Sequence, residues 1–273
     1  MREYELIKAR KLGLNLEKYD RPEFDVQQLA EIRRGLEAGV NVEIYAKPEF
    51  NAYTMHTILR GLIDGIDENI DFSNFNALQI DLIVDGFIEG LNIYYYAFPH
   101  FRHQQMKVLM EILRDGDDEI NDIARPIYPP SLMKGLHLYK DKQEELLDYF
   151  NDDYNEEQIS GILYSYSIDV DVKPYMNLDL GYFNIVSMAD ALGKGYNPEM
   201  FTNPLYGSAE LEVLMEACDR GYDLEVLAKP DMTLNEMLAC MNILEFMKEN
   251  SIKDFEEGYI KFDAGYLYDI DFC

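Results

Sequence analysis

The sequence predicts an all-α fold, an elongated α-solenoid of about ten helix–turn repeats of ~26 residues each. Three observations support this prediction: glycine recurs at a fixed interval, proline recurs at a second fixed interval, and a helical apolar pattern precedes each glycine. The three markers keep the same phase along the chain, so they identify one repeated unit. Because a single unit cannot bury its apolar face alone, we expect neighbouring units to stack and share a continuous core.

Residues 27–51 show how one unit is expected to fold. Leu29, Ile32 and Leu36 are three or four residues apart, which places them on one face of a helix of about twelve residues. Gly39 favours the left-handed conformation that ends a helix. Pro48 prevents another helical turn, so the rest of the unit is expected to be a short helical or turn-like return. Asn51 can cap the next helix.

The same markers are found in most of the chain. The glycine stops are Gly13, Gly39, Gly65, Gly90, Gly116, Gly195 and Gly221. The loop prolines are Pro22, Pro48, Pro99, Pro126, Pro204 and Pro230. Glutamine marks helix entries at Gln28, Gln79, Gln105 and Gln158. The agreement of these series predicts one continuous array over residues 1–273.

This single solenoid is expected to contain regular repeats at 1–129, degenerate repeats at 130–181, repeats again at 182–258 and a capping tail at 259–273. Within 130–181, Pro129 and Pro130 break the chain, 136–150 reads as a helical run without a glycine stop, and 169–174 reads as extended chain. The segment is interpreted as repeat decay with preserved packing; the alternative is a bend or a partner-specific insertion. The aromatic tail is expected to cover the last helix, or alternatively to bind a partner or a second copy.

The composition of the chain indicates the cellular compartment in which the protein is expected. No run of apolar residues is long enough to cross a membrane, and the N-terminus lacks the apolar core of a signal peptide. The three cysteines, Cys218, Cys240 and Cys273, are an odd number without a metal-binding spacing. We therefore expect a cytoplasmic protein without disulfides and without membrane contact.

Charge is distributed unevenly along the chain. The formal net charge is −28, yet the first sixty residues are balanced, and no Lys or Arg occurs between Arg60 and Arg102. Equivalent helix positions change from Lys8, Arg34 and Arg60 to Asp85, Glu111, Asp190 and Glu216. Stacked repeats would align these positions in a row. The predicted partner-binding acidic stripe comprises Asp64, Asp67, Glu68, Asp71, Asp81, Asp85, Glu89, Glu111, Asp190 and Glu216.

No catalytic or cofactor motif emerges from the sequence, and we expect a protein that is not an enzyme and has no cofactor. His100 and His103 have the spacing of paired metal ligands, but no carboxylate or cysteine pattern accompanies them, so ordinary surface histidines are favoured and no metal site is predicted. The acidic turn at 115–119 lacks the glycine and glutamate positions of a calcium loop. Phosphate contact requires Lys and Arg, so direct nucleic-acid binding is not expected.

One unit also carries a family resemblance. The positions concerned are Gln28, Ile32, Gly35, Leu36, Gly39, Val40, Asn41, Val42, Tyr45, Ala46, Pro48 and Phe50. This pattern resembles a repeat of bacterial proteins from mobile genetic elements, closely over residues 5–128 and again over 208–232. The resemblance implies a helical repeat protein from a phage or conjugative element. It supplies no catalytic residues.

These features indicate a non-enzymatic acidic repeat protein that binds a basic protein partner. The sharper hypothesis is an anti-defence inhibitor that imitates nucleic-acid charge (a DNA mimic of the anti-CRISPR type) and occupies the phosphate cleft of a basic, nucleic-acid-binding nuclease. The alternatives are a general interaction scaffold whose charge only maintains solubility, and an enzyme that uses paired carboxylates such as Asp169 and Asp171.

Overall fold

The computed structural model describes residues 1–117, 120–229 and 231–252, and every regular element in this part of the chain is helical. The eleven α-helices are α1 (Arg2–Lys11), α2 (Val26–Ala38), α3 (Ala52–Ile63), α4 (Ala77–Ile88), α5 (His103–Arg114), α6 (Pro130–Leu138), α7 (Gln143–Asn151), α8 (Glu156–Ser167), α9 (Tyr182–Gly193), α10 (Ser208–Arg220) and α11 (Leu234–Glu249). The predicted all-α class is confirmed. The tail at 259–273, Pro230, Cys273 and part of the acidic turn at 115–119 lie outside the described residues.

Short 3-10 helices form the returns between the long helices. They are η1 (Glu17–Tyr19), η2 (Val42–Ile44), η3 (Phe72–Asn74), η4 (Ile93–Tyr95), η5 (Lys140–Lys142), η6 (Lys173–Tyr175), η7 (Pro198–Phe201) and η8 (Leu224–Val226). The sequence predicted this alternation of a helix of about twelve residues with a short return. An Asn or Asp side chain begins several returns by accepting a hydrogen bond from the backbone N–H two residues later, as Asn41 and Asp223 do.

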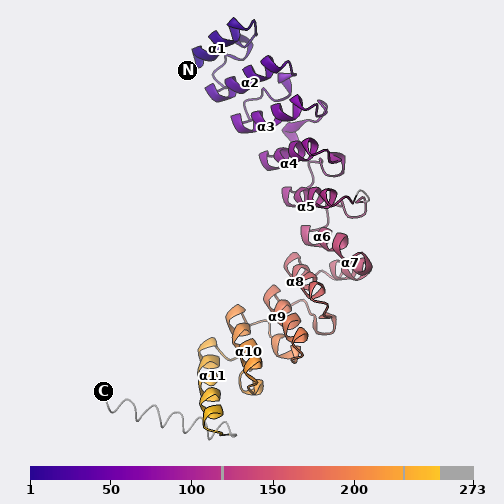
Figure 1. Cartoon of the computed structure of the whole chain (residues 1–273), viewed down its shortest axis with the longest axis vertical. Coiled ribbons are helices and arrows are strands. Elements are labelled where there is room, and N and C mark those ends of the chain that lie inside the picture. The colour runs from indigo at the N-terminus through magenta and orange to yellow at the C-terminus, as the bar shows by residue number, and fades with distance from the viewer. Residues whose placement is uncertain (118–119, 230, 253–273) are drawn as a thin grey trace, which may run out of the picture. The chain divides into compact units, whose positions relative to one another are not determined.

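The chain divides into two compact units, Met1–Asp141 and Lys142–Cys273. In the first unit each helix from α1 to α5 packs against the next one in the chain, ending with α6. In the second unit α7, α8, α9, α10 and α11 pack in the same sequential manner. Figure 1 shows this neighbour-to-neighbour stacking within each unit, with the returns on one side of the helices. Each unit therefore buries its core between successive repeats, as the repeat pattern predicted.

Buried amides begin the helices and tie each one to the loop that follows. Gln28 accepts a hydrogen bond from the N–H of the cap residue Asp25, whose side chain accepts one from the N–H of Gln28. The Nε2 atom of Gln28 also donates to the carbonyl oxygens of Pro48 and Phe50, at 3.2 and 2.7 Å. The helix-entry glutamine is thus a brace between a helix and the loop leading to the next helix.

The same brace recurs, with changes of residue type. Gln79, Gln105 and Gln158 each donate to the equivalent loop carbonyls, and Asn184 does so over a shorter span. In the first repeat Arg2 takes this role by donating to the carbonyl oxygens of Phe24 and Arg21. Polar side chains that are excluded from water need such partners, so these contacts specify where the next loop runs.

Left-handed glycines end the helices, as predicted. All seven predicted stop glycines have positive φ, between 70 and 90°. Asp169 has a φ of 57° and lies 26 residues before Gly195, so an aspartate occupies the missing stop of a degenerate repeat. Aspartate tolerates this conformation better than most residues, but still less well than glycine.

Replacing Asp169 with glycine is therefore expected to raise the free energy of unfolding by about 0.5–1 kcal/mol, because the strain of a side chain at positive φ is removed. Valine at the same position should lower the free energy of unfolding instead. Urea unfolding followed by circular dichroism measures both changes. Equal stabilities of the two variants would show that the left-handed conformation is not required there.

The degenerate segment keeps the repeat register. Helices α6, α8 and α9 begin at residues 130, 156 and 182, each 26 residues after the one before. The predicted helical run at 136–150 is wrong as one helix, because Tyr139 leaves the helical conformation and α7 begins anew at Gln143. Helix α7 stands where other repeats have only a 3-10 turn. The extended reading of 169–174 is also wrong: Asp169 lies in a turn and η6 begins at Lys173.

The core lies on more than one side of the repeat helices. Leu29 and Ile32 are fully buried, as predicted. Glu31 and Arg33, which fall outside the predicted apolar stripe, are buried as well, with 8% and 4% of their surfaces exposed. A helix stacked between two neighbours is covered from both directions, so its flanking polar positions also leave the solvent.

Candidate interaction surface

Equivalent helix positions meet between neighbouring repeats, as the predicted row requires. Arg60 of α3 forms an ion pair with Asp85 of α4, and these residues hold the same position in successive helices. In the second unit the hydroxyl of Tyr164 in α8 donates to Asp190 in α9 at 2.6 Å, again between equivalent positions. The switch from basic to acidic residues in the first unit thus falls at a direct contact between Arg60 and Asp85.

Four of the ten predicted acidic residues are neutralised by cations of the chain itself. Asp85 pairs with Arg60, and Glu216 pairs with Arg220 in the same helix. Glu89 receives two hydrogen bonds of 2.6 Å from Arg114, and these lower the pKa of its carboxyl. Asp71 lies 3.4 Å from the ammonium of Lys47. Three of these exposed pairs link adjacent repeats, and each pair contributes little stability individually.

Four more of these carboxylates bind neutral groups. Asp81 accepts from the hydroxyls of Tyr53 and Thr57, and Glu68 accepts from the amide of Asn41. Asp67 accepts from the Asn69 backbone, which lowers the pKa of its carboxyl, and from the hydroxyl of Tyr94 at 3.2 Å. Asp190 is bound by Tyr164 as described above. None of these four carboxylates has an ion pair with a cation among the described residues.

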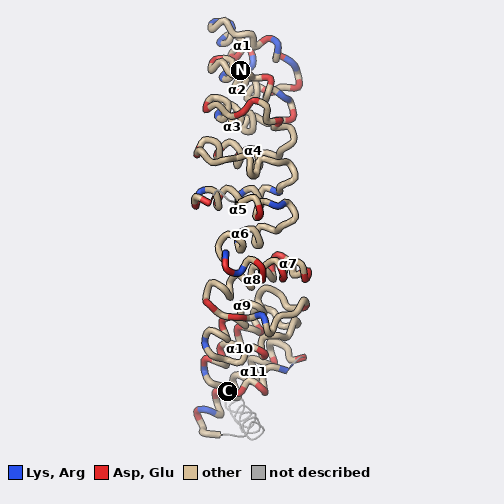
Figure 2. Tube along the Cα trace, turned by 90° about the vertical axis from the view of Figure 1, so that its right-hand side faces the viewer, with Lys and Arg blue, Asp and Glu red and all other residues tan. Residues whose placement is uncertain are grey.

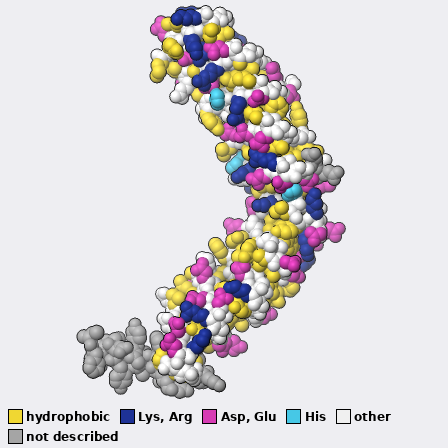
Figure 3. Space-filling view, in the orientation of Figure 1, with side chains coloured by type: hydrophobic (Ala, Val, Ile, Leu, Met, Phe, Trp, Pro, Cys, Tyr) yellow, Lys and Arg dark blue, Asp and Glu magenta, His cyan; other side chains and the backbone are white. Residues whose placement is uncertain are grey.

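Asp64 and Glu111 complete the predicted set, and neither has an ion pair within the part of the chain that the structure describes. The predicted stripe is therefore mixed. Part of it consists of connections between repeats, and part consists of ionised groups facing solvent. Figure 3 agrees, since the face it shows interleaves acidic, basic and hydrophobic side chains over both units.

One long span without Lys or Arg lies in the first unit. In Figure 2 the tube through α4 carries no basic residue, in line with the span from Gly61 to Phe101. The span is bordered by Arg60, which is paired with Asp85, and by Arg102, which is exposed. A cationic group approaching α4 and its return therefore meets no basic side chain from within this span.

A second acid-rich surface was missed at the level of sequence. No Lys or Arg occurs between Lys142 and Lys173, and this span contains α7 and α8. Exposed carboxylates without an ion pair among the described residues are Glu144, Asp148, Asp152, Asp153, Glu156 and Glu157. The absence of Lys and Arg from this span can be read from the sequence, but the segment was interpreted only as repeat decay. We call this group the α7 acidic surface.

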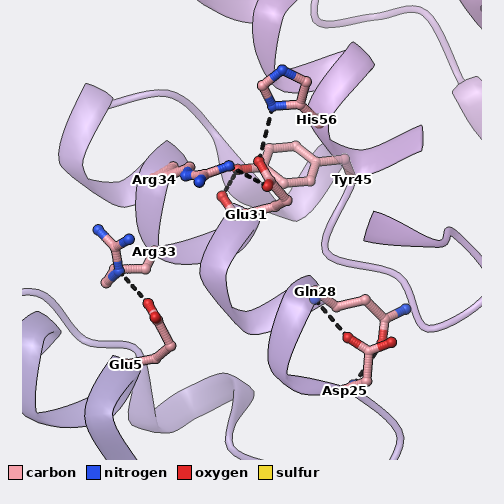
Figure 4. Close-up of polar contacts among 8 residues, drawn as sticks. All are labelled: Glu5, Asp25, Gln28, Glu31, Arg33, Arg34, Tyr45 and His56. Atoms are coloured by element: carbon pink, nitrogen blue, oxygen red, sulfur yellow. Dashed lines mark hydrogen bonds and ion pairs between the residues drawn. The ribbon is translucent and has the colours of Figure 1, made fainter. Parts of the chain in front are cut away.

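A polar hollow of about 440 Å³ lies between α2 and α3. Glu31 forms its floor, and Figure 4 shows one carboxylate oxygen directed at Arg34 and the other at His56. The Nδ1 atom of His56 lies 3.1 Å from Glu31. Since its own neighbours satisfy both oxygens, Glu31 anchors α2 to α3. The predicted basic residue Arg34 is likewise engaged.

A second anchor in Figure 4 joins α1 to α2. The guanidinium of Arg33 binds Glu5 at 2.6 Å and also Glu37, and its side chain is only 5% exposed. A charge removed from water needs such compensation. Arg33, unlike Arg34, could not serve as part of a basic surface patch.

The other candidate sites remain isolated. His100 stacks on Phe98 with their ring centroids 5.5 Å apart. Within the described residues no three His, Cys, Asp or Glu side chains converge as metal ligands would.

Cys218 and Cys240 are free thiols, and partial burial raises the pKa of both. None of the described helices combines the length and the apolar character that a membrane crossing needs.

No protein family, no curated protein and no solved structure matches this chain. The interpretation of its function therefore rests on the chemistry of its own surface.

Proposed function

We propose that this chain is a non-enzymatic repeat scaffold that binds a basic protein partner through carboxylates that its own cations leave unpaired. The α7 acidic surface carries the proposal, because its six carboxylates are exposed and lack an internal cation, whereas acids elsewhere in the chain are often paired. Like charges held close together on a folded scaffold attract and orient a cationic partner.

The sharper form of the proposal concerns a nucleic-acid-binding partner. A nuclease cleft built for phosphates presents Lys and Arg, and a rigid array of carboxylates offers it a competing ligand. We propose this class of partner, and the resemblance to mobile-element repeats supports it. An inhibitor of this kind would be displaced by excess nucleic acid.

The test uses charge neutralisation, because reversing Asp85 or Glu216 would also break an internal ion pair. A variant with Glu144→Gln, Asp148→Asn and Asp152→Asn removes three charges from the α7 acidic surface. We expect it to bind a labelled peptide of alternating Arg and Gly about tenfold more weakly than the wild type in low salt, because each exposed charge contributes modestly. Fluorescence anisotropy at two salt concentrations measures the effect.

The matched control changes three exposed acids in the charge-balanced first sixty residues, Glu3, Glu23 and Glu49, to Gln. These have no ion pair among the described residues, and the net charge changes equally. Equal losses in the two variants would show that only net charge matters, and the proposal of a local surface would then be rejected. The sharper form is tested by adding the wild-type protein to DNA-cleavage assays of basic nucleases. Cleavage that is unaffected by the protein would exclude the inhibitor role.

A further inference from the structure

The returns of the first unit contain a repeated cation–aromatic contact. In three loops a Lys or Arg precedes the loop proline and lies over the aromatic ring three residues later. The distances to the ring centroids are 5.4 Å for Arg21 over Phe24, 5.7 Å for Lys47 over Phe50 and 5.7 Å for Arg125 over Tyr128. A cation attracted to the face of an aromatic ring in this way stabilises the loop.

The fourth such loop of this unit departs from the rule. Its sequence is Phe98-Pro99-His100-Phe101, so an aromatic residue replaces the cation. The backbone is nevertheless the same: the N–H of Phe98 donates to Tyr96 at 2.7 Å, as that of Lys47 donates to Tyr45 at 2.7 Å. The N–H of Phe101 then donates to Phe98 at 3.1 Å, matching the 3.0 Å bond from Phe50 to Lys47. Only the cation is missing.

The rings around this position form an open hollow of about 260 Å³. Tyr94, Tyr95, Phe98 and His100 line it, and Asn121 and Pro126 of the next loop close its other side. Phe98 and Tyr94 are 43% and 61% exposed, so part of each ring remains open to a ligand although Phe98 stacks on His100. We call this feature the Phe98 hollow.

The electrostatic surroundings favour a cation. Five of the residues that line the Phe98 hollow belong to the span without Lys or Arg, and the hydroxyl of one of them, Tyr94, donates to the carboxylate of Asp67. Two arginines adjoin lining residues: Arg125, which is paired with Asp122 at 3.0 Å and lies over Tyr128, and Arg102, which follows Phe101 and is exposed. Aromatic faces near a carboxylate that has no cation of its own are the combination that recognises a guanidinium or ammonium group.

We propose that the Phe98 hollow binds a cationic side chain of a basic partner, preferably arginine, which lies against the exposed ring of Phe98, the residue that stands where the sister loops carry Arg21, Lys47 and Arg125. This inference rests on the proposed function and names one side-chain site for it. The planar guanidinium stacks on rings more readily than the compact ammonium of lysine does.

Phe98→Arg tests the site, because it restores the cation found in the three sister loops. Their shared backbone geometry indicates that the variant will fold. Its own guanidinium should occupy the hollow, so the alternating Arg and Gly peptide should bind at least about tenfold more weakly. Leu78→Arg is the control: it adds the same charge to the same repeat at an exposed position that does not line the hollow. We expect it to weaken binding less than about threefold.

Phe98→Ala provides a second test without a change of charge. Loss of one ring should weaken binding about three- to fivefold. The ring proton signals of the four histidines provide a local readout by NMR. On addition of the peptide the His100 signal should shift, whereas that of His56 in α3 should shift much less. The signals can be assigned with single His→Gln variants.

The outcomes separate this inference from the proposed function. If the peptide binds but Phe98→Arg and Leu78→Arg weaken it equally, or His100 does not respond, then the hollow is not the site and the acidic scaffold remains supported. If the wild-type chain does not bind the peptide at all, both proposals are overturned.

Discussion

Replacing Gln105 with leucine is expected to lower the free energy of unfolding by about 2–3 kcal/mol, because several polar backbone groups lose their partners. The Gln105 side chain, with 1% of the residue exposed, accepts from the N–H of Arg102 and donates to the carbonyl oxygens of Pro126 and Tyr128, at 2.8 and 2.7 Å. Leucine fits the helix and adds apolar surface, but it can make none of these bonds. Urea unfolding followed by far-UV circular dichroism would measure the change.

Gln104→Leu is the matched control, since its side chain is exposed one position earlier in the same helix. We expect a change within about 0.5 kcal/mol there. If the two variants are equally stable, the brace between helix and loop does not contribute to the fold as we argue. A further check is hydrogen exchange at residues 125–128, where opening should be faster in Gln105→Leu than in the control.

The brace shows what the sequence could and could not predict. The recurrence of Gln28, Gln79, Gln105 and Gln158 marked helix starts, but the bonds to carbonyls about twenty residues ahead depend on where the next loop passes over the helix. No local pattern contains that information. Arg2 performs the same task with a different residue type, so comparison of repeats by residue identity could not identify it.

Local chemistry, by contrast, was readable from the sequence. A left-handed helix stop favours glycine for steric reasons, so the glycine series indicated most of the helix ends directly. The burial of Arg33 and Glu31 was not readable, because apolar periodicity shows one face and says nothing about the coverage of a helix from two sides. The break at Tyr139 was equally hidden, since no proline or glycine marks it.

For the candidate surface, the repeat spacing contained an unused signal. Opposite charges one period apart, as in Arg60 with Asp85 and Glu89 with Arg114, are ion pairs in the structure. Subtracting the internal ion pairs from the ten residues of the acidic stripe leaves six without a cation of the described chain. The α7 acidic surface contains none of these internal ion pairs. We therefore place the proposed binding surface on α7 and the start of α8 and not on the acidic stripe.

Changing Gly86 to alanine is expected to lower the free energy of unfolding by about 2–3 kcal/mol, although alanine favours an exposed helix by about 1 kcal/mol. A Cβ atom at this position would lie 1.8 Å from the hydroxyl oxygen of Tyr96, which is fully buried and donates to the carbonyl oxygen of Leu82 at 3.0 Å. Gly35 and Tyr45 repeat this arrangement in α2, with a Cβ distance of 1.9 Å. The pairing explains why glycine is required within a helix that would otherwise exclude it.

Tyr96→Phe should partly rescue the alanine variant, because it removes the atom in closest conflict. In the wild-type background the same change should cost about 1 kcal/mol through the lost hydrogen bond. The double variant is therefore expected to be more stable than Gly86→Ala alone, and strict additivity of the two single changes would contradict the proposed conflict. Gly193→Ala in α9 is the control. Its Cβ would find no atom closer than 3.9 Å, so helix propensity alone should act there and raise stability by about 0.5–1 kcal/mol.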